Sequence, residues 1–541
     1  MNTRTDRRIR IGAGIGAALL AIAFLLGGFV VLLTAGGQAP DFESLALDPY
    51  VRAIFGFTLL QAGLSTLLSV LLAIPFALAL HRLRFPGRRL ILRLFLLPQA
   101  LPVLVGALAV ITIWGRNGVV SEAMASLGLP RLEIYGLSGI LVAHVFFNMP
   151  LAARLFVSAL DRVPAEAWKL SGQLALPSTT VFRLVEWPAL KSALPGAAAL
   201  IFMLCVTSFT IVLVLGGGPA ATTLEVAVYQ ALRYDFDPAR AIGLSLIQIV
   251  LTAAVLSVTL RFGRDPAGGF GLGGKARRFD AAGPLRGLLD PLVVAAGTLF
   301  VVSPFVAILV SGLAADLSRL VTEPAVIDAA ATSLAVSLAA ACLSLLVSTL
   351  VLMAIEALGR GPRQGVAARS ARNLLELATS LVLVVSPVIV GAGWFLLLRG
   401  FTDVLAAGPY VVVATNAVMA MPFIVRIVGP ALREANAGTG RLAESLGLTG
   451  LARLVFVEWP VLRRPMALAF AFAIALSFGD LGAIALFGSN DFVTLPYLLL
   501  QRMGSYRTAD AAGLALLLGL ITIALMAIVE RGFIERRDIA V

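Results

Sequence analysis

The chain has 541 residues, of which 59% are hydrophobic and only 13% are charged, and its mean hydropathy is +0.97. The charged share is about half that of soluble domains, and a soluble chain of this size would need far more polar surface. The two cysteines, Cys205 and Cys342, lie in apolar runs, so we expect small buried side chains and exclude a disulfide framework. The two histidines are too few for a metal cluster.

Apolar segments long enough to cross a hydrocarbon layer of about 30 Å as helix recur along the whole chain. We predict twelve spans, at residues 11–34, 54–80, 90–114, 136–160, 193–215, 240–262, 289–313, 329–355, 374–399, 410–432, 464–487 and 511–530. The first span exceeds the apolar core of about 7–15 residues found in signal peptides, so we expect a retained helix. The predicted fold class is an all-α polytopic membrane protein.

Basic residues gather on one side of the predicted membrane. With the N-terminus in the cytoplasm, 33 of the 42 Lys and Arg residues fall in cytoplasmic segments and 9 in external ones. This skew is the positive-inside pattern, and it explains the net charge of +12 without nucleic acid. Acidic residues lie in the predicted external loops: Asp41, Glu43, Asp48, Asp316, Glu323 and Asp328. We therefore expect both termini in the cytoplasm.

The twelve spans form two sets of six. Spans 54–80 and 329–355, 90–114 and 374–399, and 193–215 and 464–487 occur in the same order with similar loop lengths. Because six is even, the two sets would insert in the same orientation as parallel repeats. We predict a first permease-like half at 1–262, a cytoplasmic linker at 263–288 and a second half at 289–541.

The predicted linker contains "GFGLGGKA" at residues 269–276, which follows the spacing of a phosphate-binding loop. Such a loop needs Ser or Thr where Ala276 stands, and it needs a preceding strand, whereas a membrane helix precedes this segment. We interpret the segment as a flexible basic linker and expect no nucleotide site in this chain.

A similar loop follows the fourth span of each half. The first loop, residues 161–191, contains "VEWP" at 185–188, and the second loop, residues 433–464, contains it at 457–460. In each loop a short helical pattern precedes a bend and places two leucines on one face, Leu170 with Leu174 and Leu442 with Leu446. Helices this short need a partner surface, and two related copies imply a two-fold partner.

The ends of these loops carry paired residues with a predicted structural role. Trp187 and Trp459 suit the interfacial zone of a membrane. Pro188 and Pro460 disfavour helix just before them, so we expect them to fix the turn into the next span. An ordinary interfacial loop with an aromatic anchor is the structural alternative.

The two loops resemble the coupling loop of ATP-binding-cassette importer permeases, in which a glycine precedes a Leu–Pro pair by 13 residues. Gly447 keeps that distance to Pro460, and Ala175 takes the glycine position ahead of Pro188. This chain has Trp–Pro in place of Leu–Pro, and Lys169 and Arg441 where that family has a glutamate.

Two further stretches, residues 209–241 and 476–512, resemble the permease of the thiamine and thiamine pyrophosphate importer. That family has the same fused twelve-span layout, so the resemblance covers nearly the whole chain. Ferric-iron importer permeases share the layout but usually differ where "GDLGAIALFG" stands at 479–488.

The resemblance implies a multi-pass permease subunit of the bacterial inner membrane that performs no chemistry itself. Its implied partners are a homodimeric ATP-binding-cassette ATPase, which holds ATP and Mg, and a periplasmic substrate-binding protein. The implied cargo is thiamine or phosphorylated thiamine. We expect no cofactor, metal or nucleic acid on this chain, whose surface contacts membrane lipid.

From the repeat and the resemblance we predict three groups of site residues. Coupling to the ATPase is assigned to Leu170, Leu174, Trp187, Pro188, Leu442, Leu446, Gly447, Trp459 and Pro460. Contact with the binding protein is assigned to Tyr229, Tyr234, Tyr497 and Tyr506, although these tyrosines could instead cap the helix bundle. The substrate pathway is assigned to Asp480, Ser208 and Phe209.

Asp480 lies inside the eleventh predicted span, where an ionised carboxylate costs a few kcal/mol and usually has a role or a partner. Because thiamine carries a fixed positive charge, such an acid could offset that charge during passage. The structural alternative is that Asp480 caps a helix after Gly479 or binds an arginine.

A ferric-iron importer permease is the alternative within the same superfamily, and a secondary transporter is the alternative outside it. Major-facilitator proteins also have six plus six parallel spans, with G-x-x-x-D-R-x-G-R-R between spans two and three. Here that loop reads "HRLRFPGRR" at 81–89, which lacks the aspartate. Such a transporter also has no need of a duplicated loop between spans four and five, and it would not co-purify with a nucleotide-hydrolysing subunit.

Overall fold

The computed structural model describes residues 3–35, 47–262, 284–359, 365–382 and 385–534. Regular structure in these ranges is helical, without strands, and eleven helices are long and apolar enough to cross a membrane. The predicted all-α polytopic class is therefore confirmed. Most of the predicted linker, including the glycine-rich segment 269–276, lies outside the described residues.

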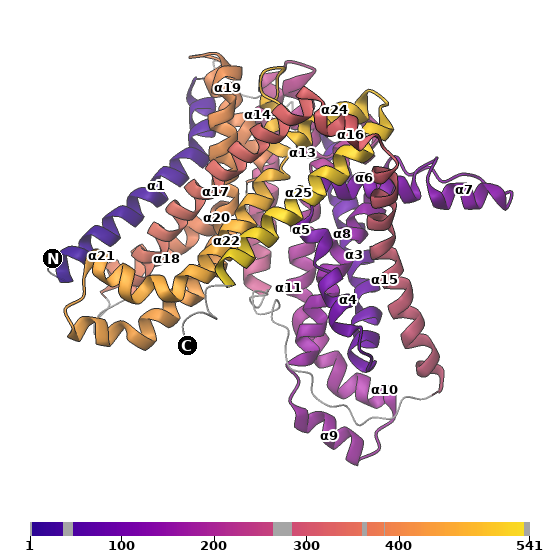
Figure 1. The fold of residues 1–541 in the computed structure, drawn as a ribbon, viewed down its shortest axis with the longest axis horizontal. Helices are drawn as coiled ribbons and strands as arrows, with labels where there is room; N and C mark the ends of the chain where they lie inside the picture. The colour runs from indigo at the N-terminus through magenta and orange to yellow at the C-terminus, as the bar shows by residue number, and fades with distance from the viewer. Residues whose placement is uncertain (1–2, 36–46, 263–283, 360–364, 383–384, 535–541) are drawn as a thin grey trace. The chain divides into compact units, whose positions relative to one another are not determined.

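The contacts divide the chain into two compact units. Unit 1 comprises Met1–Phe42, Val228–Ser245 and Asp316–Val541, and unit 2 comprises Glu43–Ala227 and Leu246–Ala315. Neither unit is one continuous stretch, because the first helix of each predicted half packs with helices of the other half. In unit 1, α1 lies along α17 and α19, and in unit 2, α15 lies along α3 and α6 (Figure 1).

Unit 2 is a helical bundle whose longest members are α3, α8, α11 and α15. Its helices are α3 (Pro49–Arg82), α4 (Arg88–Leu94), α5 (Leu97–Ala100), α6 (Val103–Trp114), α7 (Val119–Ser126), α8 (Leu137–Asp161), α9 (Ala165–Gln173), α10 (Ser178–Val181), the π-helix η1 (Phe182–Glu186), α11 (Trp187–Val206), α12 (Thr210–Leu215), the 3₁₀-helix η2 (Pro219–Ala221) and α15 (Pro284–Leu313). Helices α13 (Leu224–Arg233) and α14 (Pro238–Phe262) each contribute residues to both units.

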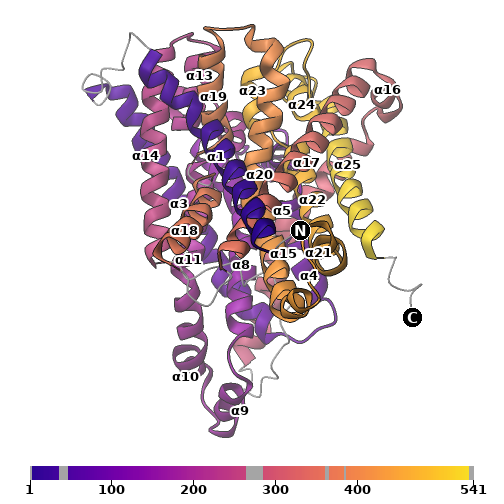
Figure 2. The same ribbon diagram turned by 90° about the vertical axis from the view of Figure 1, so that its left-hand side faces the viewer.

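Unit 1 is built around the long helices α17, α20 and α22. Its helices are α1 (Thr3–Ala35), α16 (Leu317–Thr322), α17 (Pro324–Gly359), α18 (Val366–Leu381), α19 (Pro387–Leu398), α20 (Val404–Ser445), α21 (Gly450–Arg453), the π-helix η5 (Leu454–Glu458), α22 (Trp459–Phe478), α23 (Gly482–Phe487), α24 (Leu495–Gly504) and α25 (Thr508–Ile534). Figure 2 shows α1 on the outside of this unit, and its contacts place it along α17.

The third and ninth predicted spans are not the continuous helices that we expected. In the third, α4 and α5 end before Pro102, which begins α6 as its N-cap residue. In the ninth, the amphipathic α18 precedes Pro387, the first residue of α19. Proline disfavours helix at the residue before it and suits the first turn of a new helix, and a new helix starts at both positions. Helix α19 has 12 residues and spans about 18 Å, which is shorter than a hydrocarbon layer, so eleven candidate spans remain.

Glycines allow close helix packing in both units. A Cβ added to Gly297 on α15 would lie 2.5 Å from the ring of Phe76, which is buried and stacks on Phe95 at 4.6 Å. A Cβ added to Gly14 on α1 would lie 2.5 Å from the carbonyl oxygen of Leu350 on α17. Small residues are typical of membrane helix interfaces, because they let two backbones approach.

The two cysteines differ in exposure. Cys205 is buried on α11, as expected, but Cys342 is exposed on α17. The expectation of burial was wrong for Cys342 because an apolar run in a membrane protein can face lipid as well as the protein interior.

Candidate functional site

The first loop forms a short helix with one buried face and one exposed face. Pro164 is the N-cap residue of α9, and both views show α9 at the far end of α8 and α11 (Figures 1 and 2). Trp168 is fully buried, with its ring 5.4 Å from that of His81. Leu170 and Leu174 are 55% and 61% exposed. The predicted apolar face of this helix is therefore available to a partner.

In the second loop the corresponding helix is the last part of α20, which continues to Ser445 without a break. Asn436 occupies the position of Pro164, 272 residues later, and asparagine lets the helix continue where proline starts a new one. Leu446 is 65% exposed just beyond the helix end. The side chain of Leu442 lies outside the described part of the chain.

Both loops bend after the short helix, as predicted, and the turn lies at the residue in the family's glycine position. Ala175 has φ +45° and Gly447 has φ +65°, and each lies 13 residues before its proline. The N–H of Leu176 donates to the carbonyl of Ser171 at 3.1 Å, and that of Leu448 donates to Ala443 at 2.9 Å. This pattern is the Schellman motif, which ends a helix through one residue in the left-handed region.

Opposite substitutions at these two turns are expected to have opposite effects on stability. Ala175→Gly should stabilise the chain by up to about 1 kcal/mol, because the left-handed conformation strains alanine but not glycine. Gly447→Ala should destabilise it by about 1 kcal/mol for the same reason. Thermal unfolding of the detergent-solubilised chain measures both effects. Shifts of the same sign would show that backbone conformation does not decide the outcome.

The prolines of the two "VEWP" segments do not end the preceding helix, so our prediction of a fixed turn there was wrong. Trp187 and Trp459 are helical, and their N–H groups donate to Phe182 and Leu454, five residues earlier. Each proline lacks an N–H and would crowd the carbonyl four residues before it. A single π turn, η1 or η5, relieves that crowding and carries the chain into the fifth span of its half. Trp187 and Trp459 are 37% and 46% exposed.

The acid of each "VEWP" segment is fully buried, which our choice of site residues missed. Glu186 is bound by Arg82 at 2.6 Å, and Glu458 is bound by Arg10 at 2.8 Å. The signal was in the sequence, because the same acid occurs twice in otherwise apolar surroundings. Only the structure identifies the arginines, which come from distant parts of the chain.

The fifth and eleventh predicted spans are interrupted at equivalent positions. Helix α11 ends at Val206 and α12 begins at Thr210, while α22 ends at Phe478 and α23 begins at Gly482. All four boundaries keep the 272-residue offset of the repeat. The predicted pathway residues Ser208, Phe209 and Asp480 all lie in these three-residue gaps. Irregular backbone at membrane depth is tolerated only where protein or a polar cavity satisfies it.

Side chains of neighbouring helices satisfy the first interruption. The amide nitrogens of Gln61 and Gln248 donate to the carbonyls of Cys205 and Val206 at 2.8 Å and 3.2 Å. Buried His144 lies between two hydroxyls, with Nδ1 2.9 Å from Ser65 and Nε2 2.8 Å from Ser208. Phe209 is buried. Ser208 is thus held in place by α8, through His144.

At the second interruption, Asp480 caps the helix that follows it. Its Oδ1 accepts from the N–H of Gly482 at 3.2 Å, and its Oδ2 accepts from Ala483 at 3.3 Å. Asn416 of α20 donates to the hydroxyl of Ser477 at 2.9 Å. Within the described residues, the polar contacts of Asp480 are with these backbone groups, and no arginine is paired with it. The structural alternative, a helix cap, is therefore what the geometry shows, and a pathway role stays a prediction.

The segments after the interrupted helices are held by equivalent hydroxyls. Thr58 of α3 accepts from the N–H of Leu224 at 3.1 Å, and Ser333 of α17 accepts from the N–H of Leu495 at 2.8 Å. All four residues are buried. Each hydroxyl fixes the start of a short helix: α13, which carries Tyr229, or α24, which carries Tyr497.

Two of the four predicted tyrosines are buried and two are exposed. Tyr229 and Tyr497 are buried, whereas Tyr234 and Tyr506 are 65% and 91% exposed. Tyr229 and Tyr234 meet edge to face at 5.8 Å, and Arg233 donates to the hydroxyl of Tyr497 at 3.4 Å. Burial is the main cause that raises the pKa of Tyr229, and a hydrogen bond with Tyr234 raises it further. The hydroxyl of Tyr229 therefore stays protonated. Tyr229 and Tyr497 thus lie inside the helix packing, and of the four tyrosines the exposed pair is placed to contact a partner.

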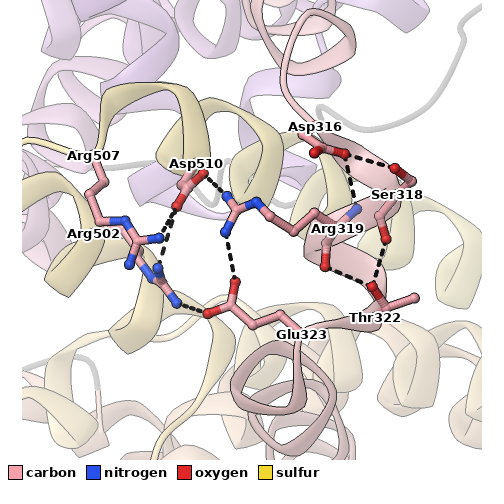
Figure 3. A network of polar contacts seen from close by, with 8 residues as sticks. All are labelled: Asp316, Ser318, Arg319, Thr322, Glu323, Arg502, Arg507 and Asp510. Atoms are coloured by element: carbon pink, nitrogen blue, oxygen red, sulfur yellow. Dashed lines mark hydrogen bonds and ion pairs between the residues drawn. The ribbon is translucent and has the colours of Figure 1, made fainter.

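An ionic network joins α16, α24 and the start of α25 (Figure 3). Asp510 pairs with Arg319, with Arg502 at 3.3 Å and with Arg507 at 2.8 Å, and Glu323 bridges Arg319 and Arg502. These paired charges fix the position of α16 relative to α24 and α25, which are far from α16 in sequence.

Asp316 begins α16 beside this network (Figure 3). It accepts from the N–H of Arg319 at 3.0 Å and from the hydroxyl of Ser318 at 2.7 Å. These hydrogen bonds hold the pKa of this exposed carboxyl below its ordinary value. Its contribution to the helix start is therefore lost only as the pH falls through the lowered pKa.

Asp510→Asn is expected to destabilise unit 1 by about 1–3 kcal/mol, because it leaves the arginines without their shared anion. The effect should shrink at high salt, since the rim of the network is exposed. Thermal unfolding at low and high salt measures it, with Asp403→Asn, an exposed cap at the start of α20, as the control. Equal losses for the two variants would show that the network adds nothing to a single cap.

The comparisons with known proteins agree with this arrangement. No protein-family model matches the chain. The thiamine transport system permease protein ThiP of Brucella abortus (strain 2308) is 49% identical over 528 residues, covering 97% of this chain and 95% of the relative. The chain belongs to the ThiP family. ThiP of Escherichia coli (strain K12) is 40% identical over 519 residues, covering 96% of each chain.

A more distant relative shows how this ThiP-family chain is organised. The sulfate transport system permease protein CysT of Salmonella typhimurium is 27% identical over 275 residues, covering 49% of this chain and 98% of the relative. A nearly complete CysT chain thus aligns with about half of the ThiP-family chain. The chain is a multi-pass membrane permease of a bacterial transport system, and its relatives are named as permeases and not as enzymes.

Proposed function

We propose that this permease carries thiamine or a phosphate ester of thiamine across the bacterial inner membrane. The observation that carries the proposal is the 49% identity to the ThiP protein of Brucella abortus over 97% of the chain. In this proposal ATP and Mg are bound by a homodimeric partner ATPase, and a periplasmic protein delivers the substrate. Both chain termini lie in the cytoplasm.

The paired loops support coupling to a two-fold symmetric ATPase. Each loop ends its helix in the same Schellman turn, and Leu170, Leu174 and Leu446 are more than half exposed. Exposed leucines on the cytoplasmic side of a membrane protein gain free energy when they dock on a partner. Two equivalent loops present such a surface twice, which suits an ATPase homodimer.

The interrupted helices support a polar pathway through the membrane region. Backbone breaks at equivalent positions of two repeats are typical of transporter substrate sites. Asp480 supplies a carboxylate that accepts from two backbone N–H groups and, among the described residues, is not paired with an arginine. The fixed positive charge of the thiazolium ring is of the sign that such a group attracts.

The decisive experiment uses the complete complex in proteoliposomes, with ATPase and binding protein. ATP hydrolysis and uptake should both rise with thiamine or its phosphates, and neither should respond to ferric iron or sulfate. Stimulation by ferric iron in place of thiamine would support the alternative importer. Uptake by the permease alone, without ATPase, would establish a secondary transporter.

A further inference from the structure

The further inference concerns how each coupling loop is attached to the membrane helices. Glu186 and Glu458 are the last residues of the two π turns, and both are fully buried. A buried carboxylate must be paired and hydrogen-bonded, or its loop cannot hold this conformation. The source of the pairing cation therefore decides which helix each loop is attached to.

The first loop is attached to a helix of its own predicted half. Arg82, the last residue of α3, donates Nε to Oε1 of Glu186 at 3.0 Å and Nη2 to Oε2 at 2.6 Å. This two-pronged geometry fixes orientation as well as distance. Arg82 also lies 3.5 Å from Asp290 of α15.

The second loop is attached to the N-terminal helix. Arg10 of α1 donates Nη1 to both carboxylate oxygens of Glu458, at 2.8 Å and 3.1 Å. Arg453, within the loop, adds a bond to Oε1 at 3.2 Å and binds the side-chain oxygen of Asn436 at 3.2 Å. Arg10 also pairs with Asp6 one turn earlier, at 3.2 Å.

The sequence repeat explains why the cation that pairs with Glu458 comes from α1 and not from α17. Pairing of spans 54–80 and 329–355 places Ala357 of α17 at the position of Arg82, so the second half has no arginine there. The carbonyl of Ala357 instead accepts from Nε of Arg7 at 3.0 Å. Helix α1 thus supplies the guanidinium that α17 lacks.

Helix α1 is held firmly enough to act as an attachment point. The indole nitrogen of Trp394 on α19 donates to the carbonyl of Phe24 at 2.9 Å, and the two rings stack at 5.0 Å. A Cβ on Gly28 would lie 2.8 Å from the backbone of Gly393, so α1 and α19 are in direct backbone contact. With Gly14 packed on α17, these contacts fix α1 along much of its length.

We propose that Arg10 is a positioning residue that attaches the second coupling loop to α1, so that the loop and this helix move together during transport. Arg82 does the same for the first loop through α3. The inference rests on the proposed function, since it concerns how the pull of a partner ATPase reaches the membrane helices. It also makes the two loops unequal, because only the second depends on the N-terminal helix.

The test replaces Arg10 by methionine in the complete complex of permease, ATPase and binding protein. The Arg10→Met variant should assemble and retain basal ATP hydrolysis, but uptake per ATP hydrolysed should fall at least fivefold. Arg10→Lys should restore part of this ratio, since it keeps one of the hydrogen bonds. The matched control is Arg8→Met, an exposed residue that carries the same charge near the same end. It should leave the ratio unchanged.

A second measurement does not depend on transport. Hydrogen exchange of backbone amides in Arg10→Met should rise at least tenfold in residues 453–462 and stay unchanged in residues 181–190. Equal changes in both loops, or none in either, would overturn the assignment of Arg10 to the second loop.

The double variant Arg10→Met with Glu458→Gln keeps the test decisive if the single variant fails to fold. The double variant removes one positive and one negative charge together, and Arg453 keeps its bond to Asn436, so this variant should assemble yet remain poorly coupled. Recovery of full coupling would show that the pair serves folding only and would overturn the proposal. Failure of the wild-type complex to respond to thiamine would count against the proposed function. The hydrogen-exchange measurement would still test whether Arg10 attaches the second loop to α1.

Discussion

Replacing Leu170 and Leu446 together by aspartate is expected to separate the permease from its ATPase. The two side chains are 55% and 65% exposed, and they lie on the two coupling loops. Burial of each leucine against a partner contributes about 1.5–3 kcal/mol, and a carboxylate in the same contact adds a desolvation cost. The double change should weaken the complex by about a thousandfold or more.

Co-purification and a binding titration with the isolated ATPase measure this loss. Leu127→Asp is the matched control, because this leucine is 76% exposed but lies beyond the end of α7, outside both loops. All variants should unfold at the wild-type temperature, since the leucines contribute little to the fold. Retention of the ATPase by the double variant would disprove docking through these leucines.

Asp480→Asn is expected to lower thiamine-stimulated ATP hydrolysis by at least tenfold while leaving the complex assembled. Asparagine keeps an oxygen that can accept from Gly482, so the start of α23 should survive, but the negative charge is lost. A tenfold loss corresponds to about 1.4 kcal/mol of interaction with the cation. The loss should be smaller with thiamine pyrophosphate, whose phosphates already offset the ring charge.

Two further variants separate charge from capping. Asp480→Ala removes both functions and should also reduce thermal stability, by about 1 kcal/mol. Asp403→Asn makes the same chemical change in another helix cap, at the start of α20, and should leave hydrolysis unchanged. Full thiamine stimulation in Asp480→Asn would remove this residue from the substrate pathway and leave it as a structural cap.

Hydropathy, charge asymmetry and the duplicated segment were enough to predict the helical class, most of the spans and the paired loops. Membrane insertion depends on apolar length and on basic flanks, and both are local properties of a sequence. A bend after each short helix was also predicted, but the left-handed conformation of Ala175 and Gly447 at these bends was not.

The details that needed three-dimensional structure depend on contacts between distant residues. The π turns at Pro188 and Pro460 replace the predicted break, because the surrounding bundle holds the chain helical through each proline. The burial of Tyr229 and Tyr497, the cap made by Asp480 and the partners of Glu186 and Glu458 likewise depend on neighbouring helices.

The sequence by itself therefore determined that this protein is a helical, membrane-embedded chain with two related loops, because these properties follow from composition and repetition. Only the tertiary structure decided that α1 and α15 each pack with helices of the other half, and that Arg10 pairs with Glu458. Burial of a charge requires a counter-charge, but nothing local states which of 42 basic residues will provide it.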